Sequence, residues 1–189
     1  MPLSKLDVPK TVQALALLLK ANDRTRLEYV SLLKVLYIAD RESLADVGRP
    51  ITGDVAVAMQ NGPVLSGIYD LINATVPDDD PRLWTEHLHR DNYHLELIRD
   101  PGVDQLTPYE QRKLTEVARR HRDHSCKDLI RITHDLPEWV WNRPDPEQGI
   151  LVRSIPLMDV VKAVGRGKDA DWIFEDASAA AALDELLGK

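Results

Sequence analysis

The sequence predicts a mainly helical α+β fold, in which a compact helical domain over residues 1–166 carries a small β-hairpin. An acidic, alanine-rich tail or helix over residues 167–189 is predicted to follow it. Apolar residues recur at three- and four-residue spacing over much of the chain, which is typical of amphipathic helices. Clear alternation with a period of two occurs over residues 84–98, where a hairpin is expected.

Two amphipathic helices are predicted at the N-terminal end. The apolar face of the first carries Val12, Leu15, Ala16 and Leu19. The second is expected to run from about Leu27 to Asp46. Gly48, which can take a left-handed φ, and Pro50, which cannot donate a helical hydrogen bond, should end it.

A tight turn is predicted at Asn61-Gly62-Pro63. We expect Gly62 to permit the turn and Pro63 to start a helix that continues to Ile72. Residues 51–60, which include several β-branched side chains, should form a short extended segment before the turn.

The predicted hairpin has Asp91-Asn92 as its turn, with Leu88 facing Leu95 on its apolar side. This register pairs His89 with His94 and His87 with Glu96 on the opposite face. Three imidazoles and a carboxylate at cross-strand distance could hold zinc, which would make a metal-dependent enzyme one alternative function. The other interpretation is the polar face of a half-buried hairpin. We expect no metal and no cofactor.

Capping signals predict the later helices. Thr107, Pro108 and Glu110 form a capping box that should start a helix reaching about Arg122, and Ser125 with Asp128 repeats the pattern. Further helices are expected from Pro156 to near Gly165 and over the alanine-rich residues 177–187.

Catalytic motifs are scarce in this sequence. Cys126 near a helix start could have a lowered thiol pKa, with His124 or His134 as its base, but a lone buried cysteine is the alternative. The sequence contains no nucleophile elbow, Cys-x-x-Cys pair, Walker loop or dinucleotide fingerprint. We therefore predict that the protein is not an enzyme.

The charge and cysteine content narrow the class of protein. The formal net charge is -7, so the field of the molecule repels phosphate backbones, and we expect no nucleic-acid partner. One cysteine excludes an intramolecular disulfide and suits a reducing compartment. With no signal peptide and no apolar run of about 18–20 residues, a cytoplasmic protein without a membrane partner is expected.

Several blocks, in order, resemble the Panacea domain, also called the SocA-like antitoxin domain. The resemblance covers about residues 8–142. The blocks are Leu32–Arg41, Gly48–Asp54, Ala58–Ser66, Tyr69–Ile72, Leu106-Thr107 with Glu110, Leu129–His134 and Pro137–Trp139.

The resemblance implies a bacterial or phage antitoxin that neutralises a cognate protein toxin by direct binding. That toxin is expected to be encoded next to this protein. Because the family's founding member also delivers its toxin to the Clp degradation machinery, an adaptor for a Clp-type protease is an alternative function. Neither role requires a catalytic residue.

The residues of the matched blocks are expected to be mainly structural. They include Lys34, Asp40, Gly48, Gly62, Pro63, His134 and Trp139. For partner binding we expect exposed side chains beside these structural residues, namely Arg49, Gln60 and Asn61, with Trp141 as an aromatic anchor.

Overall fold

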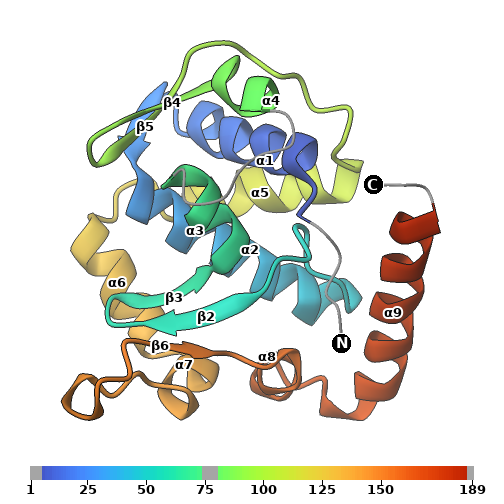
Figure 1. Cartoon of the computed structure of the whole chain (residues 1–189). Coiled ribbons are helices and arrows are strands. Elements are labelled where there is room, and N and C mark those ends of the chain that lie inside the picture. The colour runs from blue at the N-terminus through green and yellow to red at the C-terminus, as the bar shows by residue number, and fades with distance from the viewer. Residues whose placement is uncertain (1–5, 74–80, 187–189) are drawn as a thin grey trace.

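A computed structural model describes residues 6–73 and 81–186 of the chain. It confirms the predicted class, because helices dominate and the described residues form two small antiparallel sheets of three strands each (Figure 1). In these described ranges, no helix has both the length and the apolar character needed to cross a membrane.

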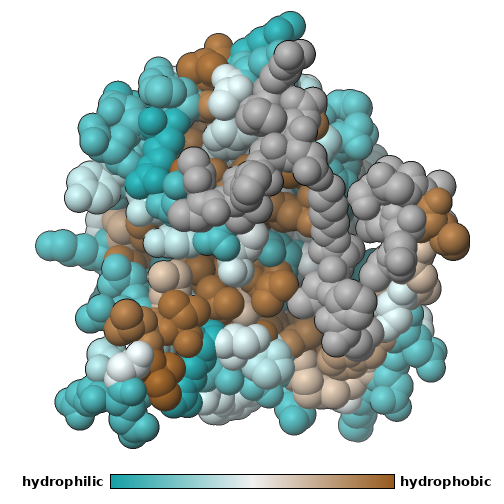
Figure 2. All heavy atoms as spheres, viewed as in Figure 1, coloured by the Kyte–Doolittle hydropathy of each residue, from teal (hydrophilic) through white to brown (hydrophobic). Residues whose placement is uncertain are grey.

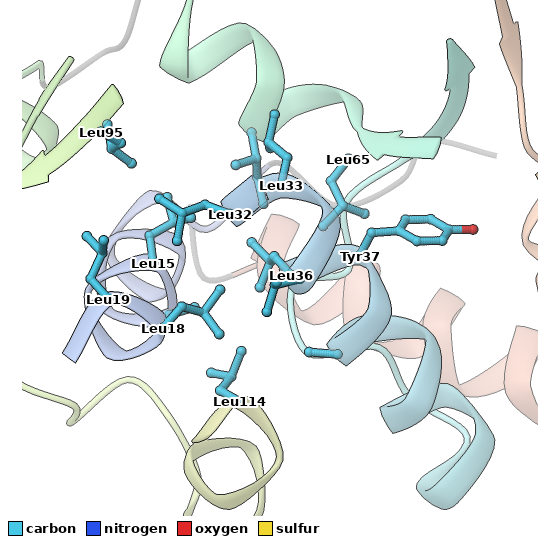
Figure 3. Close-up of a cluster of buried hydrophobic side chains, with 14 of the residues drawn as sticks. Leu15, Leu18, Leu19, Leu32, Leu33, Leu36, Tyr37, Leu65, Leu95 and Leu114 are labelled. Atoms are coloured by element: carbon cyan, nitrogen blue, oxygen red, sulfur yellow. The ribbon is translucent and has the colours of Figure 1, made fainter. Parts of the chain in front are cut away.

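The main core lies between three helices, α1 (Val8–Ala21), α2 (Tyr29–Val47) and α5 (Pro108–Arg120). Each contributes leucines to it, and α2 contacts both of the others (Figure 3). Burial of one leucine side chain contributes about 1.5–3 kcal/mol, so this contact layer anchors the fold. The leucines of these three helices that Figure 3 labels are Leu15, Leu18 and Leu19 of α1, Leu32, Leu33 and Leu36 of α2, and Leu114 of α5.

The first sheet covers one end of these helices. Its strands are β1 (Arg26–Glu28), β4 (Leu88–Asp91), which follows the short helix α4 (Pro81–Thr85), and β5 (His94–Leu97), in the order β1-β5-β4. The predicted helix start at Leu27 is wrong. Leu27 pairs with Leu95 of β5, and this distant pairing outweighs the local helical spacing.

The predicted hairpin is present, but the register predicted for it is wrong. Asn92 and Tyr93 form the turn, with Asn92 at φ 52°, and His89 pairs with Glu96. Asparagine tolerates the left-handed region better than most residues, which favours the turn one position further along. Leu88 and Leu95 do share the buried face, although they are not directly opposite, because Leu88 pairs with Leu97.

The second sheet contains β2 (Ala56–Met59), β3 (Gly62–Leu65) and β6 (Val152–Ser154), in the order β3-β2-β6, and α3 (Ser66–Ile72) follows β3. The prediction that Pro63 starts a helix is wrong. Pro63 lies in β3 opposite Ala58, at the edge of the sheet, where a missing backbone N–H is tolerated.

Helices α6 (Cys126–His134) and α7 (Pro137–Trp141) complete the part of the fold that surrounds this sheet. The capping boxes predicted at Thr107 and Ser125 are confirmed, since each side chain accepts a hydrogen bond from the third residue of its helix. The predicted end of the first of these helices was two residues too late, because α5 stops at Arg120.

The C-terminal region packs through a second, smaller core. This region contains the short 3-10 helices η1 (Pro146–Gln148) and η2 (Gly167–Asp169) and the α-helices α8 (Leu157–Ala163) and α9 (Ala170–Leu186). The last helix begins earlier than the predicted residue 177, because Ala170 and Ile173 are buried in this core; Leu187 lies outside the described residues. The second core consists of Leu44, Ala58, Trp139, Ile155, Val160, Val161, Ala170 and Ile173.

Candidate functional site

The turn between β2 and β3 packs against α2 and α6. Gln60 and Asn61 are exposed at its tip, and Gly62 has φ 97°. A Cβ atom on Gly62 would lie 2.8 Å from Thr133 Oγ1 and 3.0 Å from Lys34 Nζ. A side chain has no room there, so the glycine lets the turn rest directly on the helices.

Lys34 of α2 forms a buried hydrogen bond with this turn. Its side chain is fully buried, at 0% exposure, and Nζ donates a hydrogen bond to the Pro63 carbonyl at 2.7 Å. Burial disfavours the charged form and lowers the pKa of the amine to about 7. Lys34 therefore acts as a buried donor to the hairpin and not as a surface charge.

The pH dependence of stability should report this lysine. Between pH 7 and 10.5 the unfolded chain holds a proton on Lys34 that the folded chain has lost, so the free energy of unfolding rises with pH. Lys34→Met should reduce the slope by roughly 1 kcal/mol per pH unit in this window. Urea unfolding at several pH values measures it, with the exposed Lys162→Met as control; equal slopes in all three proteins would contradict the assignment.

Gly62 can be tested against a second glycine that also has a positive φ but has free space at its Cβ position. We expect Gly62→Ala to lower the free energy of unfolding by about 1–3 kcal/mol more than Gly149→Ala, because only the first places Cβ against neighbouring atoms. Gly149 has φ 76° and nothing within 4 Å of its Cβ position, so it reports backbone strain alone. Chemical denaturation of both variants gives the difference, and equal losses would show that the turn is not in tight contact.

His134 and Trp139 support the other side of the turn. Their rings stack with centroids 4.0 Å apart, and Trp139 Nε1 donates to the Met59 carbonyl at 3.1 Å. Burial, followed by the nearby Lys34, lowers the pKa of His134, and a backbone hydrogen bond at Gln60 opposes this. The last turn of α6 and helix α7 are thus joined to the chain where β2 enters the turn, at Met59 and Gln60.

A buried ion pair ties α7 to α2. Glu138, which has no exposed surface, accepts hydrogen bonds from Arg41 Nε at 2.7 Å and from the Tyr37 hydroxyl at 3.1 Å. Burial and the neighbouring Glu138 carboxylate raise the pKa of Tyr37 well above its usual value, so the hydroxyl remains a donor. This contact fixes the helix that carries Trp139 and Trp141.

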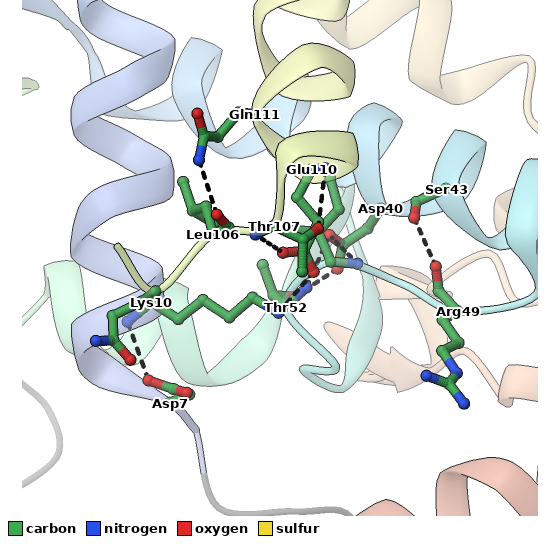
Figure 4. A network of polar contacts seen from close by, with 12 residues as sticks. Asp7, Lys10, Asp40, Ser43, Arg49, Thr52, Leu106, Thr107, Glu110 and Gln111 are labelled. Carbon is green, nitrogen blue, oxygen red and sulfur yellow. Dashed lines mark hydrogen bonds and ion pairs between the residues drawn. The ribbon is translucent and has the colours of Figure 1, made fainter. Parts of the chain in front are cut away.

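Asp40 organises the chain between α2 and the second sheet (Figure 4). It accepts hydrogen bonds from the backbone N–H groups of Ile51 and Thr52, at 3.2 and 3.1 Å, and from the Thr52 hydroxyl. Burial raises the pKa of the carboxyl to about 7, although these hydrogen bonds oppose the shift. The residue closes a loop in the core and has no access to a ligand.

Gly48 and Arg49 face the C-terminal helix and not the turn. Gly48 has φ 77°, and the ring of Trp172 on α9 occupies the place where its Cβ would lie. Arg49 pairs with Asp176 of the same helix. Figure 1 shows α9 and the β2–β3 turn at opposite sides of the molecule, so Arg49 is not brought together with Gln60 and Asn61.

Exposed apolar side chains lie near the turn. Val140 and Trp141 are 52% and 55% exposed on α7, and Leu151 and Val152 are exposed at the start of β6. Each group contains or adjoins a residue that contacts Met59. Val152 pairs with Met59, and Trp139, which precedes Val140 in α7, donates to its carbonyl. Hydrophobic residues gather over this end of the sheet in Figure 2. We call Gln60, Asn61, Val140, Trp141, Leu151 and Val152 the hairpin-end surface.

The residues proposed for zinc do not converge. His87 has its Nδ1 3.1 Å from the Arg99 carbonyl, and His89 lies opposite Glu96 instead of His94. Over residues 6–73 and 81–186, no three His, Cys, Asp or Glu side chains are placed to hold a metal ion. The geometric basis of the zinc hypothesis, which was the other register, is therefore missing.

The alternative of a reactive thiol also meets a contrary electrostatic environment. Burial raises the pKa of Cys126, although its position at the start of α6 was expected to lower it. The nearby Glu28 adds to the increase. His134, one of the two bases considered, is stacked on Trp139.

Sequence reasoning missed three of the exposed apolar residues. It placed Glu138 in a family block but missed the buried contacts that this residue makes with α2. Val140 next to Trp141, and Leu151 next to Val152, are adjacent apolar pairs in short segments with no helical or strand periodicity, and that irregularity was the available signal. No local signal distinguishes Glu138 from a solvated carboxylate, because its partners Tyr37 and Arg41 lie about one hundred residues away.

The fold and this site define a mainly helical α+β domain that presents a rigidly supported β-turn. The chain belongs to the family described as antitoxin SocA-like, Panacea domain, whose model matches residues 32–140. This confirms the resemblance found in the sequence blocks and gives the chain an antitoxin-like role. No curated protein and no solved structure matches the chain.

Proposed function

We propose that this protein neutralises a protein toxin in the cytoplasm by binding it directly. Membership in the antitoxin family is the observation that carries the proposal. The matched residues 32–140 include Lys34, Gly62, His134 and Trp139, which support the turn. The toxin would be encoded beside this chain. The mechanism needs a stable complex and no chemical step.

The hairpin-end surface is the part of the molecule that we propose for toxin binding. Trp141 and Val140 offer exposed apolar area on α7, and aromatic residues of this kind dominate many protein interfaces. Gln60 and Asn61 add amide donors and acceptors beside them. An apolar centre with polar neighbours is the usual composition of a specific interface.

The buried contacts below the turn favour this choice of surface. Lys34, His134 and Trp139 hold the β2–β3 connection from within, so its exposed tip is ordered before the partner arrives. Ordering a flexible loop on binding costs free energy, about 0.5–1.5 kcal/mol for each immobilised side chain. A turn that is already ordered avoids much of this cost. Arg49, held by Asp176, lies outside the proposed surface.

Co-expression with the neighbouring gene tests the function. Growth should stop when the neighbour is expressed alone and recover when this chain is expressed with it. A tag on this chain should recover the neighbour as a complex of defined stoichiometry. A neighbour that is harmless, or one that is toxic but neither rescued nor bound, would contradict the proposal.

A further inference from the structure

A cavity of about 350 Å³ opens between the end of α1, strand β1 and the connection from α5 to α6. Its floor is apolar, because the half-buried Leu27 lines it together with the buried side chains of Leu18, Leu32 and Leu129. The volume lies at the lower end of the range for small-molecule sites. No residue of the hairpin-end surface lines this cavity, so it is separate from the proposed toxin site.

The polar lining of the cavity is cationic in an acidic protein. Glu28 is its one acidic side chain, whereas the formal net charge of the whole chain is -7. A concave site with this local excess of positive charge concentrates anions. The basic side chains that line it are Arg24, Arg26, Arg122, His94, His121 and His124.

Two of these arginines are available to a ligand. Arg26 is already paired with Asp91 at 2.7 Å. Arg122 makes only a 3.9 Å contact with the adjacent Asp123, and Arg24 has no carboxylate within ion-pair distance among the described residues. Glu28, the one carboxylate of the lining, lies near the Cys126 thiol and accepts a hydrogen bond from the Ser31 hydroxyl, and among the described residues it forms no ion pair with either arginine.

Two buried polar atoms beside the cavity lack partners. Asn22 lines the cavity and is 7% exposed, and its Oδ1 accepts no hydrogen bond from the described residues; His121 Nδ1 is in the same situation. An unpaired buried polar atom costs about 1–3 kcal/mol, and in native proteins it often indicates a missing ligand or water. The cavity therefore has an excess of positive charge. It also has buried polar atoms that form no hydrogen bond with the described residues.

We propose that this cavity binds a small organic phosphate. The phosphate oxygens would face Arg24 and Arg122, whose planar guanidinium groups match phosphate geometry through paired N–H donors. The organic body would lie on the leucine floor, and a hydroxyl or amine on it could donate to Asn22. The apolar floor distinguishes this ligand from inorganic phosphate, and the two free arginines distinguish it from a neutral molecule.

Titration calorimetry of the full chain with phenyl phosphate tests the site. We expect saturable binding at least tenfold tighter than that of inorganic phosphate or benzoate. The double variant Arg24→Gln/Arg122→Gln should weaken it at least tenfold, whereas Arg131→Gln, an exposed arginine on α6 outside the cavity, should leave it unchanged. Thermal unfolding of each variant verifies that the fold is intact.

The single cysteine supplies a second, site-specific measurement. Cys126 lines the cavity, so saturating phenyl phosphate should slow its alkylation in the natural chain but not in the double variant. Absence of saturable binding at millimolar phenyl phosphate, or binding that the double variant retains, would overturn the site. Benzoate binding equally well would overturn the phosphate class, and inorganic phosphate binding equally well would overturn the organic body.

Discussion

Replacing Trp139 by alanine is expected to lower the free energy of unfolding by about 3–5 kcal/mol. The side chain is 5% exposed and belongs to the second core with Ala58 and Ile155. Its removal opens a cavity. It also removes the indole N–H that donates a hydrogen bond to the Met59 carbonyl, and the ring on which His134 stacks. Urea or thermal unfolding of the purified variant measures the loss.

Trp141 is the matched control on the same short helix. It is 55% exposed, so Trp141→Ala should change the free energy of unfolding by about 0.5 kcal/mol. A similar loss in both variants would show that α7 is held by its general helical packing and not by the specific contacts of Trp139. A small loss for Trp139→Ala would contradict the description of the second core.

Toxin binding should respond in the opposite order. We expect Trp141→Ala to weaken binding by about 2–4 kcal/mol, a roughly 30- to 1000-fold rise in Kd, because a large exposed aromatic side chain at the centre of an interface contributes far more than its neighbours. Calorimetry or surface plasmon resonance with the purified toxin measures the change. The contrast between stability and binding separates a supporting residue from a contacting one.

Trp172→Ala is the control for this binding experiment. Trp172 is also about half exposed, but it lies on α9 beside Gly48, away from the hairpin-end surface. Its replacement should leave the Kd unchanged. Loss of affinity with Trp172→Ala and none with Trp141→Ala would move the toxin site to the face formed by α9 and Arg49.

The features that could be predicted from sequence are the local ones. The caps at Thr107 and Ser125 depend on atoms within three residues, and the helix end at Gly48 depends on one backbone conformation. Apolar spacing also identified the core faces of the first two helices. All the atoms that form such a cap lie within a few residues of one another. Contacts with distant parts of the chain therefore do not change these features.

The errors arose where pairing with a neighbouring strand decides the structure. Val64 and Leu65 fit helical spacing, but they lie in β3 because β2 pairs with them. Leu27 lies in β1 because β5 lies beside it. In the hairpin, a displacement of the turn by one residue changed every cross-strand partner and separated His89 from His94.

The candidate site was predictable in part. The family blocks indicated Lys34, Gly62 and His134, and the structure gathers these under one turn. The contacts among these three residues could not be predicted from the sequence. The residues come from α2, β3 and α6, which are separated by tens of residues along the chain. Arg49 illustrates the limit, since it lies in a matched block but pairs with a helix outside the family match.

Titration of the toxin's activity with this purified protein tests the central claim most directly. If the protein neutralises the toxin by binding, inhibition should rise linearly and become complete at a fixed molar ratio close to one. Full inactivation by a small fraction of an equivalent would indicate catalysis, and a toxin that stays active in the presence of excess protein would indicate that neutralisation is not the function. Either result would contradict the account.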